Sequence, residues 1–128
     1  MVEEMEESDS PDARPEPTVE TKVAKALVRA IKKYYGRGPT SAKAHFLEDD
    51  VLIVIMRDPA TTAERAMADA GKQEDAREFR LSFQNVYADE LRGVVEATTG
   101  RTVATYHSQI MFDPDMLFEI FVFESSSS

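Results

Sequence analysis

Apolar side chains recur every three or four residues near the start of the chain, from about Val19 to Tyr35. The apolar positions are Val23, Leu27, Ala30, Ile31 and Tyr34. This spacing predicts an amphipathic helix. Thr18 is a suitable N-cap, because its hydroxyl can accept a hydrogen bond from an amide of the first turn. Gly36 is a suitable end, because glycine adopts the left-handed conformation that closes helices.

Two strands are predicted next. Ser41–Leu47 alternates between small or apolar side chains and polar ones, whereas Val51–Met56 is apolar throughout. The acidic residues Glu48–Asp50 separate the two segments, which is typical of a β-hairpin. Because the second strand is apolar on both faces, we expect both faces of the sheet to be covered, one by helices and the other by a partner subunit.

Two helices are predicted in the middle of the chain. A short one, Ala63–Ala70, is capped by Thr61 or Thr62 and ends at Gly71. A long one follows from about Gln73 to Thr99, and its helical spacing predicts a buried stripe. The stripe consists of Ala76, Phe79, Phe83, Val86, Tyr87, Leu91, Val94 and Val95, with Arg77, Arg80, Asp89, Arg92 and Glu96 mostly outside it. Gly93 interrupts this helix, and we expect it to mark a close approach of another segment.

The end of the chain predicts a second hairpin. Thr102–Met111 alternates as a strand, Phe112–Asp115 forms a turn, and Met116–Phe123 forms the last strand. The order is therefore α-ββ-α-α-ββ. We expect an α+β fold in which helices pack on one face of a four-stranded, largely antiparallel sheet.

Composition narrows the classes of protein to consider. The 128 residues include 24 acidic and 15 basic ones, no cysteine and two histidines, His45 and His107. These counts exclude thiolate and His-rich metal sites and a Cys nucleophile, and a net charge of -9 argues against nonspecific binding to nucleic acid. The longest apolar stretch, Val51–Met56, is too short to cross a membrane, and the acidic N-terminus is unlike a signal peptide. We expect a soluble, cytoplasmic protein without direct membrane insertion.

The charge is concentrated in one tail. Residues 1–17 hold seven acidic residues, three prolines and one base, Arg14, so we expect them to be disordered and dispensable for folding. Residues 18–124 form the single folded domain, with a net charge of -3, and residues 125–128 are a short serine tail. The acidic tail is either a solubilising extension or an electrostatic arm that binds a basic surface.

Several short motifs accompany this order of elements. They are Tyr35-Gly36-Arg37-Gly38-Pro39, the hairpin Ala42–Met56, Thr61-Thr62-Ala63-Glu64-Arg65, Arg77-Glu78-Phe79-Arg80, Thr99-Gly100-Arg101-Thr102-Val103 and His107-Ser108-Gln109-Ile110. As a set they resemble the MpsC domain family of a Na⁺-translocating, membrane-potential-generating system, over nearly all of Val19–Glu124. The resemblance implies a soluble accessory or regulatory component of an ion- or bicarbonate-handling system, which would meet the membrane through a transporter subunit.

The turn Gly36-Arg37-Gly38-Pro39 is the first candidate site. An arginine between two glycines offers a guanidinium and exposed amides, which suit a carboxylate, a phosphate or bicarbonate. The alternative is that the turn only ends the helix and leads into the strand, since a helix C-terminus repels anions.

Four further residues are candidates for binding a ligand or a partner. Glu64 is either a capping acid or the ion-pair partner of Arg37 or Arg80. Arg77 and Arg80 lie three residues apart and could hold an anion together, or form a solvated edge. His107 shares a polar strand face with Thr105 and Gln109, which favours a surface or subunit-interface histidine over a catalytic one.

Three functions follow from these observations. The first is a non-enzymatic accessory module, as the resemblance implies, acting as a homodimer. The second is a domain that senses a small anion or a nucleotide, which requires Arg37 to meet Arg77 or Arg80. The third, a hydrolase or transferase, lacks support because no nucleophile–base pair, phosphate loop or metal cluster is found in the sequence. We therefore expect no enzymatic activity, no cofactor, no metal and no nucleic-acid partner.

Overall fold

The computed structural model describes residues 16–125, and its elements follow the predicted order. They are α1 (Val19–Tyr35), β1 (Ser41–Glu48), β2 (Val51–Arg57), α2 (Thr62–Asp69), α3 (Gln73–Thr99), β3 (Val103–Phe112) and β4 (Asp115–Phe123). Both predicted tails lie outside the described residues, apart from Glu16, Pro17 and Ser125. The α+β expectation is confirmed.

The ends of α1 and α2 form as their sequences predict. The Thr18 hydroxyl accepts a hydrogen bond from the amide of Thr21, and Gly36 closes α1 with φ +80°. At the start of α2, Thr61 is the cap, and its side chain and that of Glu64 satisfy each other's backbone amides. This reciprocal arrangement is a capping box, which fixes where the helix begins.

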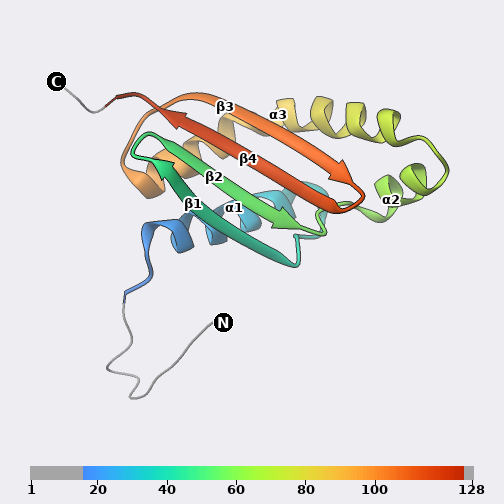
Figure 1. Cartoon of the computed structure of the whole chain (residues 1–128), viewed down its shortest axis with the longest axis horizontal. Helices are drawn as coiled ribbons and strands as arrows, with labels where there is room; N and C mark the ends of the chain where they lie inside the picture. The colour runs from blue at the N-terminus through green and yellow to red at the C-terminus, as the bar shows by residue number, and fades with distance from the viewer. Residues whose placement is uncertain (1–15, 126–128) are drawn as a thin grey trace, which may run out of the picture.

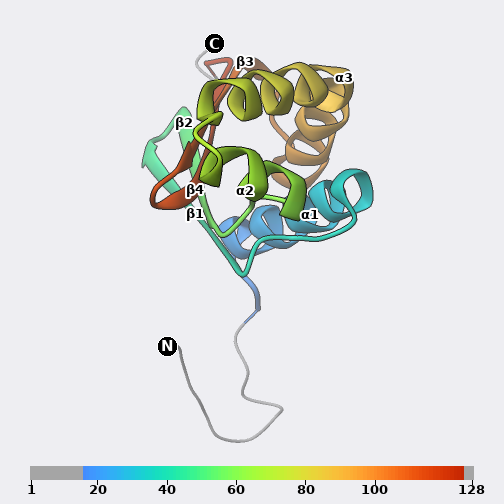
Figure 2. The ribbon, with the colours of Figure 1, turned by 90° about the vertical axis from the view of Figure 1, so that its right-hand side faces the viewer.

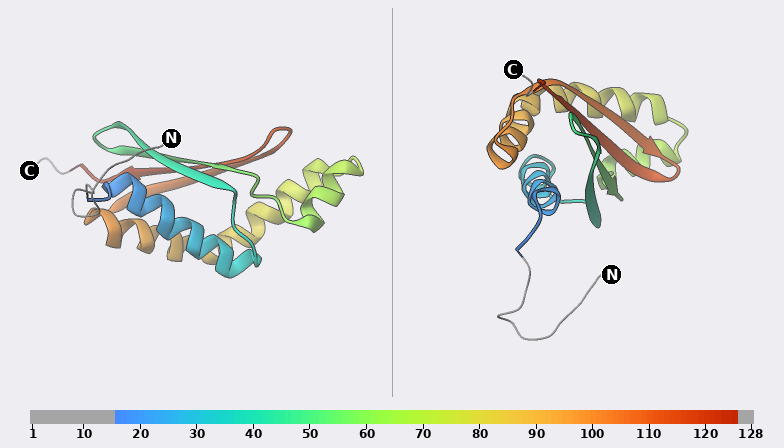
Figure 3. Two further views of the ribbon diagram at one scale, coloured as in Figure 1. Left: turned by 90° about the horizontal axis from the view of Figure 1, so that it is seen from below. Right: turned by 60° about the vertical axis from the view of Figure 1, so that its left-hand side comes forward.

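The four strands form one antiparallel sheet in the order β1-β2-β4-β3. Figure 1 shows the sheet in front with α1 and α3 behind it, and Figure 3 shows both helices on the same face. Figure 2 shows the end of the molecule where α2 lies beside the first turns of α3. The helices therefore cover one face of the sheet, and no described element covers the other.

The buried side of β2 and β4 holds alternate residues of each strand. Leu52, Val54 and Met56 of β2 are buried, while Val51, Ile53 and Ile55 between them are only half-buried. Alternate residues of a strand point to opposite faces. The expectation that both faces are covered is therefore unmet within the described chain, because helices occur on one side alone.

The predicted stripe of α3 is wrong at four positions. Phe79 and Val86 are 59% and 76% exposed, whereas Arg80 and Gln84 are buried. Arg80 and Gln84 are compatible with burial because each forms a hydrogen bond with a side chain inside the protein. Gly93 also departs from expectation: an added Cβ would meet nothing within 4 Å, so no segment within residues 16–125 approaches it closely.

Candidate functional site

The turn Gly36–Pro39 lies against the segment that joins β2 to α2. The Arg37 guanidinium is half-buried and donates a hydrogen bond to the carbonyl oxygen of Ala60. Gly38 packs on α1, since an added Cβ would lie 3.2 Å from Cγ1 of Val28. The turn therefore both ends α1 and holds the β2–α2 connection in place.

Arg80 reaches the same connection from α3. Its Nη1 donates to Oε1 of Glu64 at 2.5 Å and to the carbonyl oxygen of Pro59 at 3.2 Å. Glu64 also accepts a hydrogen bond from the amide of Thr61 at 2.8 Å. Glu64 is thus at once the capping acid and the ion-pair partner of Arg80, so both predicted roles are combined in one side chain.

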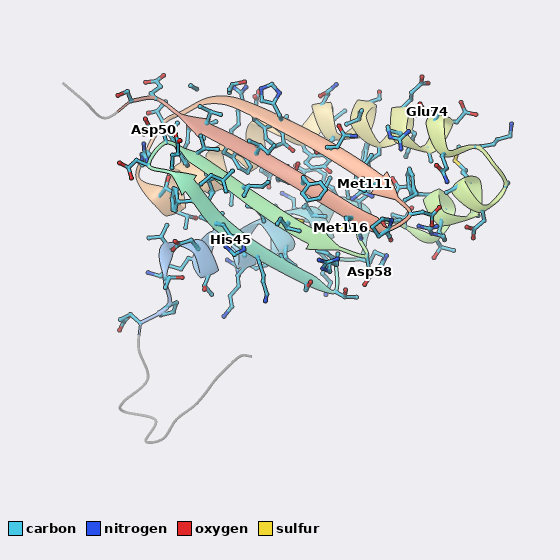
Figure 4. All side chains as sticks on the ribbon, in the orientation of Figure 1. His45, Asp50, Asp58, Glu74, Met111 and Met116 are labelled. Atoms are coloured by element: carbon cyan, nitrogen blue, oxygen red, sulfur yellow. The ribbon has the colours of Figure 1, made fainter. Side chains whose placement is uncertain are left out.

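Arg37 and Arg80 therefore donate to neighbouring carbonyls, and we call the segment Asp58–Thr61 between them the Pro59 junction. Figure 4 labels Asp58 at this end of the sheet. Asp58 has φ +57° and turns the chain out of β2. Its amide donates to the carbonyl oxygen of Asp115 at 2.9 Å. Contacts from the turn after α1, from α3 and from β4 thus converge on these four residues.

The other two predicted site residues lie elsewhere. Arg77 pairs with Glu74, labelled in Figure 4, and its Nε donates to the carbonyl oxygen of Ile110 at 3.4 Å. His107 is exposed on β3, with Nε2 3.2 Å from the hydroxyl of Thr105. The structure brings Arg37, Glu64 and Arg80 together at the junction but separates Arg77 and His107 from them.

A buried polar cluster between α3 and the sheet was missed by the sequence analysis. Glu119 of β4 is fully buried and accepts hydrogen bonds from the Tyr106 hydroxyl at 2.9 Å and from Nε2 of Gln84 at 3.2 Å. Gln84 also donates to the hydroxyl of Ser108 at 2.5 Å. The available signal was an acid at a core position of β4, between Leu117 and Phe121.

Burial determines the protonation of this cluster. It raises the pKa of the Glu119 carboxyl to about 7, although hydrogen bonds from Ser108, Tyr106 and Gln84 and the charge of Arg80 act in the opposite direction. Burial likewise raises the pKa of Tyr106, and the nearby Glu119 carboxylate adds to that effect. The Glu119 carboxyl is therefore a proton-binding group near neutral pH.

The described residues contain no group of side chains arranged to bind a metal ion. Among residues 16–125, no three side chains of His, Asp or Glu gather as ligands for an ion. His45 and His107 lie on the two outer strands, β1 and β3, which β2 and β4 separate. The two histidines therefore do not gather with an acidic residue such as Glu64 into one metal site.

The sheet face opposite the helices is apolar at its centre. Eight half-buried side chains share it: Val51, Ile53, Ile55, Met111, Met116, Phe118, Ile120 and Val122. Figure 4 shows Met111 and Met116 on neighbouring strands. Polar residues of the outer strands border this centre, with Lys43 opposite Ile55 and Gln109 opposite Phe118. We call these eight residues and their border the uncovered face.

One comparison with known proteins identifies the family of this chain. The family model described as "Na+-translocating membrane potential-generating system (MpsC)" matches residues 16–125. No curated protein and no solved structure gave a match to the sequence. Within the described residues, each helix is too short or too polar to cross a membrane. Because the family model spans nearly the whole chain, the protein belongs to the MpsC family.

Proposed function

We propose that this protein is a non-enzymatic accessory or regulatory component of the membrane-potential-generating, ion- or bicarbonate-handling system after which its family is named. It acts as a homodimer in the cytoplasm and reaches the membrane through a transporter subunit. The observation that carries this proposal is the uncovered face, because a large apolar patch on a small domain marks a surface that binds another protein.

The size of the uncovered face favours a second copy of the chain. Four strands about 4.8 Å apart and seven residues about 3.4 Å apart give a flat area of roughly 450 Å². Side-chain relief increases this area toward the ~800 Å² that each partner contributes to a stable complex. The border contains Lys43 and Arg57 and, opposite Val51, Glu48, so two copies would place charged side chains of both signs at the solvated rim.

Phe118→Arg tests the role of the uncovered face, because it introduces a charge at its centre. Light scattering at tens of micromolar should give a dimer mass for the wild type and a monomer mass for the folded variant. Val86→Arg is the matched control, since Val86 is an exposed apolar residue of α3 and should leave the dimer intact. A wild type that is monomeric at this concentration contradicts the dimer.

Complementation tests the functional part of the proposal. Cells that lack the gene should regain their membrane potential when they express the wild type or Val86→Arg. A potential-sensitive dye measures this recovery. Cells with Phe118→Arg should not regain it, provided the variant accumulates to the wild-type level. Full rescue by the monomeric variant would overturn the functional role of the dimer.

A second candidate function, sensing of a small anion or nucleotide, is favoured by the meeting of Arg37 and Arg80 at the Pro59 junction. Nε and Nη2 of Arg80 are buried and have no protein partner among the described residues. These two atoms form the edge with which arginine binds oxyanions. A thermal-shift screen with bicarbonate, phosphate and ATP tests this function, and a response that Arg37→Ala leaves unchanged would exclude Arg37 from it.

A further inference from the structure

A groove of about 840 Å³ runs between the first half of α1 and strand β1. Its apolar lining consists mainly of small side chains, including Ala24 of α1 and Ala42 and Ala44 of β1. β1 is an outer strand of the sheet, so no strand of the described residues pairs with its free edge. An unpaired strand edge is a surface that extended segments bind.

The groove is positively charged although the folded domain is acidic. Lys25 and Arg29 of α1 line it, and Glu20 is the one acidic lining residue. Lys43 and His45 of β1 lie at its rim, because their side chains alternate with the inward-facing Ala42 and Ala44. Figure 4 shows His45 on β1 near the first turns of α1. Lys25, Arg29 and Lys43 form no ion pair with another described residue. Five other basic residues do form one: Lys33, Arg65, Arg77, Arg80 and Arg101. The groove therefore favours an acidic occupant.

We propose that the occupant is the N-terminal segment of the same chain, residues 1–15. This segment carries six acidic residues and one arginine. It enters the described structure at Glu16, two residues before Thr18, which itself lines the groove. The segment is thus tethered at one end of a surface of opposite charge, where its effective concentration is in the millimolar range.

The length of the segment is sufficient. Fifteen extended residues at ~3.3 Å each reach about 50 Å, whereas the helix side of the groove, from Thr18 to Arg29, is only about 17 Å long at 1.5 Å per residue. Binding rests on exposed charges that each contribute little and are screened by salt. The bound segment covers the free edge of β1 and competes there with other acidic peptides.

A spin label on the segment tests this proposal in the full chain. The chain has no cysteine, so Ser8→Cys carries the only label. At low ionic strength, the label should broaden the amide NMR signals of Arg29 and Lys43, while those around Gln73 remain sharp. About 0.5 M NaCl, where the Debye length is about 4 Å, should restore the broadened signals.

Charge reversal and isotope mixing make the result specific. Lys25→Glu combined with Arg29→Glu should abolish the broadening at Lys43, whereas Lys72→Glu, a control far from the groove, should not. A mixture of spin-labelled ¹⁴N protein with unlabelled ¹⁵N protein should show none. Broadening in that mixture would assign the groove to the segment of a second copy and overturn intramolecular binding. Sharp signals at Arg29 and Lys43 in the labelled chain, or broadening that survives charge reversal, would overturn the site or its electrostatic basis.

Discussion

Arg80 and Glu64 form an ion pair that is enclosed by the protein. Nη1 of Arg80 lies 2.5 Å from Oε1 of Glu64, and the two side chains are 0% and 2% exposed. The Arg80 guanidinium also lies 4.0 Å from the centroid of the Tyr35 ring. The pair connects α2 with α3 and contacts the end of α1, so it joins all three helices at the Pro59 junction.

Breaking this pair should strongly destabilise the protein. Glu64→Gln keeps a capping side chain but leaves the Arg80 charge buried without its partner. We expect the free energy of unfolding, measured with urea, to fall by about 3–5 kcal/mol. Adding Arg80→Leu removes the orphaned charge and should recover part of the loss. Lys33→Ala, which breaks the exposed pair with Glu90, should cost less than ~1 kcal/mol. Equal losses for the exposed and buried pairs would contradict this account.

Glu119 should make stability depend on pH between about 4.3 and 7. Its pKa in the folded protein, about 7, lies above the unfolded value of ~4.3, so the folded state binds the proton more tightly. The contribution of Glu119 to stability is therefore complete below pH ~4.3 and is lost as the pH rises through 7. The loss amounts to roughly 4 kcal/mol, and urea unfolding at several pH values measures it.

The variant Glu119→Gln isolates this contribution. Its amide can still accept a hydrogen bond from Tyr106 and can donate one to Oε1 of Gln84, which is buried without a partner among the described residues. The variant should therefore be more stable than the wild type at pH 8, and the difference should shrink toward pH 5. Glu78→Gln, on the exposed side of α3, should follow the wild-type curve. A Glu119→Gln variant that parallels the wild type at every pH would refute the assignment.

The order and bounds of the elements could be predicted from local pattern, because helix caps, strand alternation and turn residues act over a few positions. α1 and α3 begin and end where their sequences indicate. The polar interior could not be predicted in this way. Arg80 is compatible with burial only because Glu64, 16 positions earlier, lies beside it. Gln84 and Glu119 depend on each other across 35 positions, a pairing that helical periodicity does not contain.

The candidate site was also predictable only in part, because its contacts join residues that lie far apart in the sequence. Glu64 was expected either to cap α2 or to pair with Arg37 or Arg80, and in the structure it both caps the helix and pairs with Arg80. The Arg37 guanidinium was expected to be available to an anion, whereas it is half-buried and donates to the carbonyl oxygen of Ala60. The apolar centre of the uncovered face follows from strand alternation, but the β2–β4 pairing that makes it continuous joins segments on either side of α2 and α3.

Gly93→Ala should stabilise α3. Gly93 is exposed within the helix, and an added Cβ would meet nothing within 4 Å. Alanine favours the helical backbone over glycine by about 0.5–1 kcal/mol, so urea unfolding should shift to higher concentration by that amount. Gly100→Ala is the opposite control, since Gly100 ends α3 with φ +73° and should lose stability. Destabilisation by Gly93→Ala would indicate that another chain packs there.

Deletion of residues 1–17 should leave the fold intact. Their composition cannot supply a core, and the N-cap Thr18 is retained. Binding of residues 1–15 through screened charges adds little to stability. We expect the melting temperature at physiological salt to change by less than a few degrees. A drop of several degrees would mean that the segment contributes to the folded domain.

The last prediction separates the roles of Gly36 and Arg37. Gly36→Ala places a Cβ at φ +80° and should cost about 1 kcal/mol or more. Arg37→Ala removes a charged hydrogen bond to the Ala60 carbonyl and should cost about 1.5–3 kcal/mol in urea unfolding. Arg57→Ala is the control, because its Nη1 contacts only the Met116 sulfur at 3.5 Å, a weak acceptor, and it should cost less than ~0.5 kcal/mol. Arg37→Lys should restore part of the stability, since an ammonium can reach one carbonyl but loses the planar fork.

If Arg37 also binds an anion or an acidic partner, Arg37→Lys should remain defective in complementation at wild-type protein level. If instead Arg37→Ala matches the Arg57→Ala control in stability and the wild type in complementation, the hydrogen bond to Ala60 contributes nothing measurable and the turn acts through its glycines and Pro39 alone.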